Sequence, residues 1–237
     1  MSEKDKILSY FKDHQADLLN ILRTVVELET PSHESKKASD QCSQYLQELF
    51  SNLGFRIQVI PQEKCGDHFI AEMGSGEKGI MLVGHYDTVF PLGTLQTMPF
   101  KIEGDKAYGP GILDMKGGII LGYFAVSALK SLGLLPETKI TFFINGDEES
   151  GSFLSSGRIV EEALKNKCVL VLEPGLEEIG IIKTGRYGRG TYKLTAHGKS
   201  AHSGTNPHLA ISPMLELAHQ IIKIDSMNDY KNGLTLA

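Results

Sequence analysis

Histidine and carboxylate side chains follow short apolar runs of this 237-residue chain, and one more lies in a glycine-rich loop that enters a helix. The residues are His85, Asp87, Asp114, Glu148, Glu149 and Glu173. In open α/β sheets, sites form beyond the carboxyl ends of strands, so side chains distant in sequence can converge there. One imidazole with several carboxylates, and no cysteine among them, is a ligand set suited to zinc, cobalt or manganese.

Each segment also has a plainer interpretation when it is taken alone. A histidine at a strand end more often caps or packs, and Asp114 could cap the helix that follows it. Glu148–Glu149 could be a solvated loop, and Glu173 could belong to a simple turn. Residues two apart in an extended chain point the same way, so Asp87 could hold the second ring nitrogen of His85. Only the combination of segments favours a metal site.

The composition excludes several classes of partner. The net charge is -5 and the isoelectric point about 5.9, with no basic block, which gives no electrostatic support for nucleic acid or an anionic membrane. The N-terminus is too charged to open a signal peptide, and the apolar stretch 117–129 is too short to span a bilayer. Three cysteines without a Cys-x-x-Cys pair indicate reduced thiols, and we expect a cytoplasmic protein.

Apolar periodicity predicts the elements that position these residues. We expect helices up to about residue 29 and over 36–53, 118–131 and 158–166, with strands over 55–60, 68–73, 80–83, 139–144 and 168–172. This alternation predicts an α/β fold whose sheet is covered by helices on both faces. After residue 175 we expect strands over 179–184 and 191–196 and a helix over 209–224, which start a second, α+β domain near Arg186.

Three stretches carry a family resemblance that covers essentially the whole chain. Residues 84–89 (GHYDTV), 108–118 (YGPGILDMKGG) and 146–151 (GDEESG) resemble the di-zinc exopeptidase and deacylase family. That family includes glutamate carboxypeptidase, acetylornithine deacetylase, succinyl-diaminopimelate desuccinylase and the tripeptide aminopeptidase. Residues 91–94 and 99–100 look most like the glutamate carboxypeptidase group. The resemblance implies a catalytic zinc-hydrolase domain over residues 1–185 and the first half of a lid and dimerisation domain over 186–237.

The resemblance also implies a site for two zinc ions, with cobalt or manganese as possible substitutes. His85 would bind one ion, Asp114 would bridge both, and Glu149 would bind the other. Glu173 would complete the His85 site, at a position where many relatives have aspartate. Relatives carry a fifth ligand, a histidine, in a later segment that this sequence does not include. We therefore expect the chain alone to be a fragment that holds at most one zinc tightly and turns over little substrate.

Three further roles follow from the same resemblance. Glu148 would be the general base, and Asp87 would orient His85. His202, in the stretch 198–204 (GKSAHSG), would stabilise the oxyanion from the lid, often that of the partner subunit in a dimer. Taken without the resemblance, His202 is better interpreted as a polar turn residue. We expect a homodimer formed through the lid in the full-length protein.

The implied reaction is hydrolysis of an amide bond in a small peptide or N-acyl amino acid. We expect an exopeptidase that releases a C-terminal residue such as glutamate. An N-acyl amino acid deacylase shares every residue named above and stays open as an alternative. A relative that has lost catalysis and serves as a binding module is a third possibility, against which the intact Glu148, His85 and Asp114 argue.

Overall fold

The computed structural model of the protein describes residues 2–32, 34–176 and 181–236. It divides into two compact units, residues 1–180 and 181–237, each described here by itself. The helices of the first unit are α1 (Glu3–Asp13), α2 (Gln15–Glu27), α3 (Lys36–Leu53), η1 (Thr94–Gln96), η2 (Ile112–Lys116), α4 (Gly117–Ser131) and α5 (Ser156–Ala163). Its strands are β1 (Arg56–Ile60), β2 (His68–Met73), β3 (Gly79–His85), β4 (Lys101–Glu103), β5 (Lys106–Tyr108), β6 (Ile140–Asn145) and β7 (Asn166–Val171). The second unit contains η3 (Pro207–Leu209) and α6 (Pro213–Asp225).

A mixed five-stranded sheet forms the centre of the first unit. Its strand order is β1-β2-β6-β3-β7, and β3 pairs in parallel with both β6 and β7. The carboxyl ends of these three strands therefore lie at one edge, where His85 is the register partner of Asn145. Strand β2 runs antiparallel to β6, so its first residue, His68, starts at that same edge. This topology predicts that functional groups gather there.

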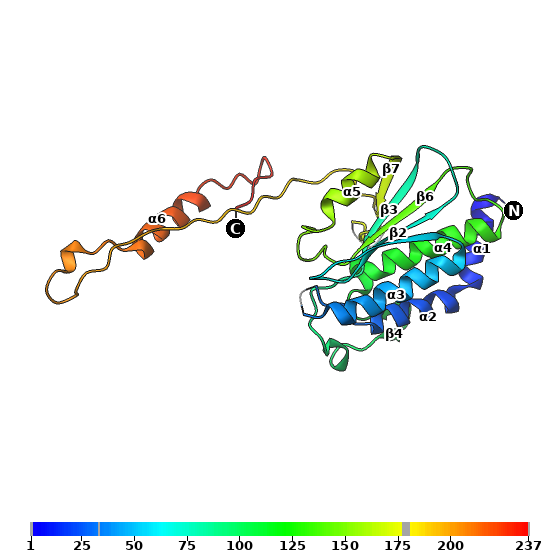
Figure 1. The fold of residues 1–237 in the computed structure, drawn as a ribbon, viewed down its shortest axis with the longest axis horizontal. Helices are drawn as coiled ribbons and strands as arrows, with labels where there is room; N and C mark the ends of the chain where they lie inside the picture. Colours follow the sequence, from blue (N-terminus) through cyan, green and yellow to red (C-terminus); the bar gives the residue numbers. More distant parts are fainter. Residues whose placement is uncertain (1, 33, 177–180, 237) are drawn as a thin grey trace. The chain divides into compact units, whose positions relative to one another are not determined.

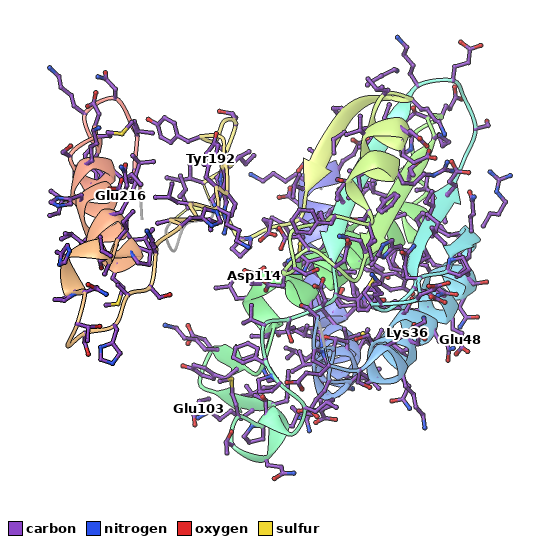
Figure 2. All side chains as sticks on the ribbon, turned by 60° about the vertical axis from the view of Figure 1, so that its left-hand side comes forward. Lys36, Glu48, Glu103, Asp114, Tyr192 and Glu216 are labelled. Carbon is purple, nitrogen blue, oxygen red and sulfur yellow. The ribbon has the colours of Figure 1, made fainter. Side chains whose placement is uncertain are left out.

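Helices cover both faces of the sheet, as the sequence predicted (Figure 1). Helix α3 packs on β1 and β2, α4 packs on β3, and α2 packs on α4, so these helices form one layer. Helix α5 lies on the opposite face beside β7. Figure 2 labels Lys36 and Glu48 on α3 and Glu103 in the β4–β5 hairpin, which stands apart from the main sheet.

Aromatic side chains fill the main core between the sheet and the α2–α4 layer. The buried ring of Phe50 contacts those of Phe55, Phe69, Tyr123 and Phe142 edge to face, at centroid distances from 4.8 to 6.0 Å. Such pairs add roughly 0.5–1.5 kcal/mol each beyond the burial of their area. A smaller cluster of Ile70, Met81 and Phe143 fills the α5 face. These two clusters pack the sheet from both faces.

The structure corrects several sequence expectations. The single N-terminal helix is wrong, because the chain breaks at His14, whose Nδ1 lies 2.8 Å from the backbone oxygen of Tyr10. The β4–β5 hairpin was not expected. The described residues 191–196 form no strand, since a strand needs a paired neighbour, and part of the run 179–184 lies outside the described residues. The last helix begins later than expected, at Pro213, where Ser212 caps it.

Helix α4 is apolar because it is a core helix. The segment Ile112–Ser131 is long and apolar enough by composition to resemble a membrane span. Within α4, however, Ile119, Ile120, Phe124 and Val126 are buried against the rest of the unit. Packing therefore accounts for this hydropathy.

Candidate metal centre

The carboxyl edge of the sheet brings the candidate ligands together around His85. This residue ends β3 and is almost fully buried, with its Nε2 directed at the carboxylates. The Nε2 atom lies 3.1 Å from Oδ1 of Asp114, 3.3 Å from Oε1 of Glu173 and 3.8 Å from Oε2 of Glu148. Glu149 also belongs to the cluster, because donor atoms of His85, Asp114 and Glu149 lie within 4.8 Å of one another. Figure 2 labels Asp114, which lies in η2 just before α4, where its own backbone is not helical and forms a loop.

The donor set fits divalent cations of the zinc type. Four carboxylates surround one imidazole, and two overlapping groups, His85–Glu148–Glu173 and His85–Asp114–Glu149, each place three donor atoms close together. Within the part of the chain that the structure describes, no lysine or arginine forms an ion pair with Asp114, Glu148 or Glu149. The excess negative charge is what one or two bound cations would balance.

The pKa values report the same excess of negative charge. Burial alone acts to lower the pKa of His85, but hydrogen bonding to Asp87 and Glu173, with the charges of Asp87 and Glu148, outweighs it and raises the pKa to about 11. Burial raises the pKa of Glu148, and the neighbouring carboxylates add to this rise against the opposing effect of His85. Burial and neighbouring carboxylates raise the pKa of Glu149 in the same way. A carboxyl whose pKa moves toward neutrality is better suited to accept and return a proton.

Asp87 connects the histidine to the acidic turn. Its backbone oxygen accepts a hydrogen bond from Nδ1 of His85 at 3.0 Å, and its Oδ1 lies 3.4 Å from that nitrogen. Its carboxylate also accepts hydrogen bonds from the backbone N–H groups of Glu148 and Glu149, each at 3.1 Å. The Ser32 hydroxyl donates to Oδ2 of Asp87 at 2.8 Å. A fully buried carboxylate thus holds both the imidazole and the turn.

The Asp114 loop is fixed by a buried lysine that the sequence did not single out. Lys116 is 1% exposed, and its ammonium donates to the backbone oxygens of Val25 at 2.9 Å and Leu28 at 2.8 Å. These carbonyls belong to the carboxyl end of α2, where intrahelical donors run out. The backbone N–H of Lys116 donates to Gly111, which closes the loop around Asp114. In the sequence, the only sign of this supporting role is a lysine two residues after Asp114.

The buried ring of Tyr86 leaves room only for glycine at two positions near the site. Tyr86 lies between His85 and Asp87 in the sequence, is fully buried, and donates its hydroxyl to the backbone oxygen of Asp67. A Cβ at Gly66 would lie 2.2 Å from this hydroxyl oxygen, and one at Gly146 would lie 2.5 Å from it. Only glycine fits in these two positions, one of which, Gly146, lies immediately before the acidic turn.

His202 lies in the second unit, so the structure does not join it to the metal cluster. It is exposed, and its Nδ1 accepts hydrogen bonds from the backbone N–H groups of Gly204 at 3.1 Å and Thr205 at 3.2 Å. In the neutral ring with Nδ1 as acceptor, Nε2 carries the hydrogen. This ring therefore presents a donor to solvent.

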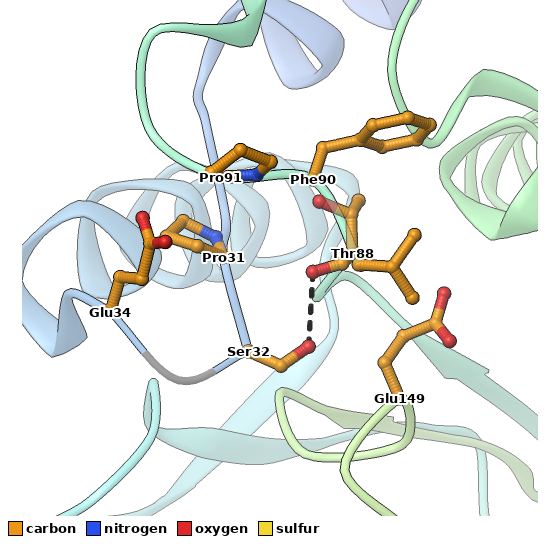
Figure 3. A pocket seen from close by; sticks show the side chains of 8 residues that line it. Pro31, Ser32, Glu34, Thr88, Phe90, Pro91 and Glu149 are labelled. Atoms are coloured by element: carbon orange, nitrogen blue, oxygen red, sulfur yellow. Dashed lines mark hydrogen bonds between the residues drawn. The ribbon is translucent and has the colours of Figure 1, made fainter.

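A pocket of about 200 Å³ opens beside Glu149 (Figure 3). It lies between two segments that pair in parallel, where Ser32 donates its backbone N–H and its hydroxyl to the backbone oxygen of Thr88. Apolar and acidic side chains share the lining, which comprises Pro31, Ser32, Glu34, Thr88, Val89, Phe90, Pro91 and Glu149. Glu34 accepts a hydrogen bond from the backbone N–H of Leu92 at 3.0 Å, which holds it at the rim.

Comparisons with known proteins agree with this geometry. The chain is 32% identical over 225 residues to carboxypeptidase G2 of Pseudomonas sp. (strain RS-16), covering 94% of this chain and 54% of that protein. It is 36% identical over 192 residues to acetylornithine deacetylase of Pasteurella multocida (strain Pm70), covering 76% of this chain and 48% of that protein. The chain thus spans about half the length of these relatives.

Solved structures share the fold. The dipeptidase Dug1p of Saccharomyces cerevisiae matches 94% of this chain and 52% of its own, with a TM-score of 0.65 at 17% identity. Human carnosine dipeptidase 1 matches 70% of this chain and 40% of its own, with a TM-score of 0.61 at 24% identity. The model of the peptidase family M20/M25/M40 matches residues 81–235. This match and the similarity to carboxypeptidase G2 show that the chain belongs to that family of amide-hydrolysing metallopeptidases and deacylases.

Proposed function

We propose that this chain carries the catalytic metal centre of an amide hydrolase that uses two zinc ions. The observation that carries the proposal is the convergence of His85, Asp114, Glu148, Glu149 and Glu173 at one sheet edge. His85, Asp114 and Glu173 would hold one ion, and Asp114 and Glu149 would contribute to the second. Cobalt or manganese fits the same donors. Bound ions would polarise the amide carbonyl and acidify a water molecule.

Glu148 is the group that moves the proton. Its carboxylate is about half exposed, lies 3.8 Å from Nε2 of His85, and is anchored through its backbone N–H to Asp87. In the reaction it takes a proton from the attacking water and passes it to the leaving amine, while Asp87 keeps the turn in place. Burial raises the pKa of Glu148, a direction that suits a group which accepts and returns a proton.

The substrate we propose is a small peptide or acylated amino acid from which a C-terminal residue such as glutamate is released. The similarity to carboxypeptidase G2 across 94% of the chain supports the exopeptidase activity. The similarity to acetylornithine deacetylase supports the alternative of an N-acyl amino acid deacylase. A panel of peptides ending in glutamate and of N-acyl amino acids, assayed with zinc-loaded full-length protein, would separate the two. Stoichiometric zinc without turnover of any member would favour a binding module instead.

The second unit would supply an oxyanion donor. We propose that His202 donates from Nε2 to the developing oxyanion, across the boundary of a homodimer in the cytoplasm. Its Nδ1 already accepts two backbone hydrogen bonds, which leaves Nε2–H as the free donor. Mixing full-length His202→Ala with full-length Glu148→Ala should restore activity, because one composite site regains both groups. Mixed dimers confirmed by mass that stay inactive would limit His202 to its own chain or to structure.

A further inference from the structure

His68 is a buried histidine that the proposed chemistry does not use. It starts β2 at the carboxyl edge of β6, next to the turn that carries Glu148 and Glu149. The side chain is 1% exposed. Its Nδ1 accepts a hydrogen bond from the backbone N–H of Gly146 at 3.2 Å. Its Nε2 lies 3.7 Å from Oδ1 of Asp147 and, within the described residues, has no hydrogen-bond partner.

These contacts fix the state of the ring. Since Nδ1 accepts from Gly146, the hydrogen of the neutral ring is on Nε2, and it faces the Asp147 carboxylate. Burial lowers the pKa of His68, and this effect exceeds the opposite effect of the carboxylates of Asp147, Asp87 and Asp67. Lys36 adds to the lowering. Both this direction and the acceptor role of Nδ1 favour the neutral ring.

Asp147 is the other half of this arrangement. Its Oδ1 accepts from the amide of Asn145 at 3.1 Å, and its Oδ2 accepts from the backbone N–H groups of Leu154 at 2.9 Å and Ser155 at 3.2 Å. The buried Asp147 carboxylate therefore closes the loop that begins with the acidic turn and ends at α5. His68 meets this loop at both Gly146 and Asp147, one residue before Glu148.

We propose that His68 is a positioning residue for the acidic turn, which it holds through Gly146 while its Nε2–H faces Asp147. Asp87, which follows β3, binds the same turn through the N–H groups of Glu148 and Glu149. Two buried groups, one at the start of β2 and one just after β3, thus set where the Glu149 carboxylate lies. The consequence for metal binding rests on the proposed role of Glu149.

Three substitutions separate hydrogen bonding from packing. His68→Asn keeps an acceptor near the position of Nδ1, His68→Gln keeps a polar group near Nε2 only, and His68→Leu keeps neither. Amide hydrogen exchange of Gly146 should quicken at least about tenfold in the Leu and Gln variants, because this buried N–H loses its acceptor. Exchange of Glu148 and Glu149, which belong to the same turn, should quicken with it. In the Asn variant, the exchange rates should stay within about threefold of those of the wild type. A pure packing role gives the reverse order, since Asn is the smallest of the three and leaves the largest cavity.

Thr141→Val is the matched control. Thr141 lies on β6, the strand that leads into the turn, and is as buried as His68. Its hydroxyl has no hydrogen-bond partner among the described residues. Loss of the Thr141 hydroxyl should leave amide hydrogen exchange in the turn unchanged. If the Leu variant exchanges like wild type, or if Thr141→Val quickens exchange as much, the proposal is overturned.

A cobalt titration followed by absorption then tests the consequence at the metal centre. The Leu and Gln variants should bind cobalt about tenfold more weakly than wild type, whereas the Asn variant should match it. Equal affinity in all variants would overturn the link to metal binding. If wild type itself takes up no cobalt, the proposed function fails, and the exchange data alone decide the role of His68.

Discussion

The carboxylate of Asp87 accepts a hydrogen bond from the backbone N–H of Glu148, 61 residues further along the chain, at 3.1 Å. The same carboxylate accepts from Glu149 and from the hydroxyl of Ser32, and it lies beside His85. A metal ligand and a candidate base therefore depend on one buried acidic group.

Replacing Glu148 by glutamine should lower kcat at least roughly a hundredfold in the full-length protein, because the amide cannot accept a proton from water. Metal content should stay unchanged, since Glu148 is not one of the proposed ligands and its backbone N–H keeps its bond to Asp87. Steady-state kinetics and elemental analysis of the same sample measure both quantities. A variant that keeps most of its activity would remove Glu148 from the mechanism.

Replacing Asp87 by asparagine should weaken metal binding roughly 10- to 100-fold without unfolding the domain. The side-chain NH₂ would face one of the two N–H groups that the carboxylate now accepts from, so the acidic turn would shift. Competition with a chelator measures the affinity, and circular dichroism controls for the fold. Ser32→Ala, which removes one donor to Asp87, should show a smaller effect of the same sign. Unchanged affinity in both variants would make Asp87 a structural residue only.

Metal binding should release about one proton per chain near pH 8, because the pKa of His85 is raised to about 11 in the metal-free site. A histidine with a raised pKa stabilises the folded metal-free chain fully below its ordinary value of 6.5, and this contribution is lost as pH rises to about 11. Apparent metal affinity should therefore increase with pH. Calorimetry in buffers of different ionisation enthalpy counts the protons. Metal uptake with no proton release would contradict the prediction.

Replacing Lys116 by methionine should lower the free energy of unfolding by about 1–3 kcal/mol, since the backbone oxygens of Val25 and Leu28 lose a buried donor. It should also weaken metal binding through the Asp114 loop. Lys130→Met is the matched control, because Lys130 donates to the backbone oxygen of Leu53 at an exposed site. Denaturant unfolding and chelator competition test both variants. Equal effects of the two substitutions would contradict a special role for Lys116.

Replacing Glu34 by glutamine should change selectivity at the pocket beside Glu149. The acidic rim and apolar walls favour an apolar acyl group with a cationic end over one with a carboxylate. The preference for lysyl-glutamate over aspartyl-glutamate should fall about two- to fivefold, as expected for a partly exposed charge. Glu27→Gln, an exposed change on α2 outside this pocket, should leave the preference unchanged. Equal preferences in wild type and Glu34→Gln would place the acyl group elsewhere.

The sequence predicted the sheet, most helices and the convergence of His85, Asp114, Glu148, Glu149 and Glu173. The periodicity of apolar residues predicts the strands and helices. The tendency of sites to form beyond the carboxyl ends of strands in α/β sheets predicts the convergence. The sequence did not predict the supporting groups. Ser32 and Lys116 donate to backbone oxygens, and His68 accepts from a backbone N–H. Backbone groups of this kind are common to every residue type, so such a partner leaves no mark on the sequence. The break at His14 was missed for the same reason, since it depends on one ring nitrogen and one carbonyl.

The hydrogen bonds that hold the centre join segments that are far apart along the chain. Thr30 reaches Tyr86 across 56 residues, Asp87 reaches Glu149 across 62, and Lys116 reaches Val25 across 91. Such contacts give the region a high contact order, and they form only after the entropy of closing long loops has been overcome. The centre should therefore be among the last parts of the chain to become ordered during folding. Metal ions would then be captured by an almost finished domain and would not nucleate it, in contrast to a zinc finger.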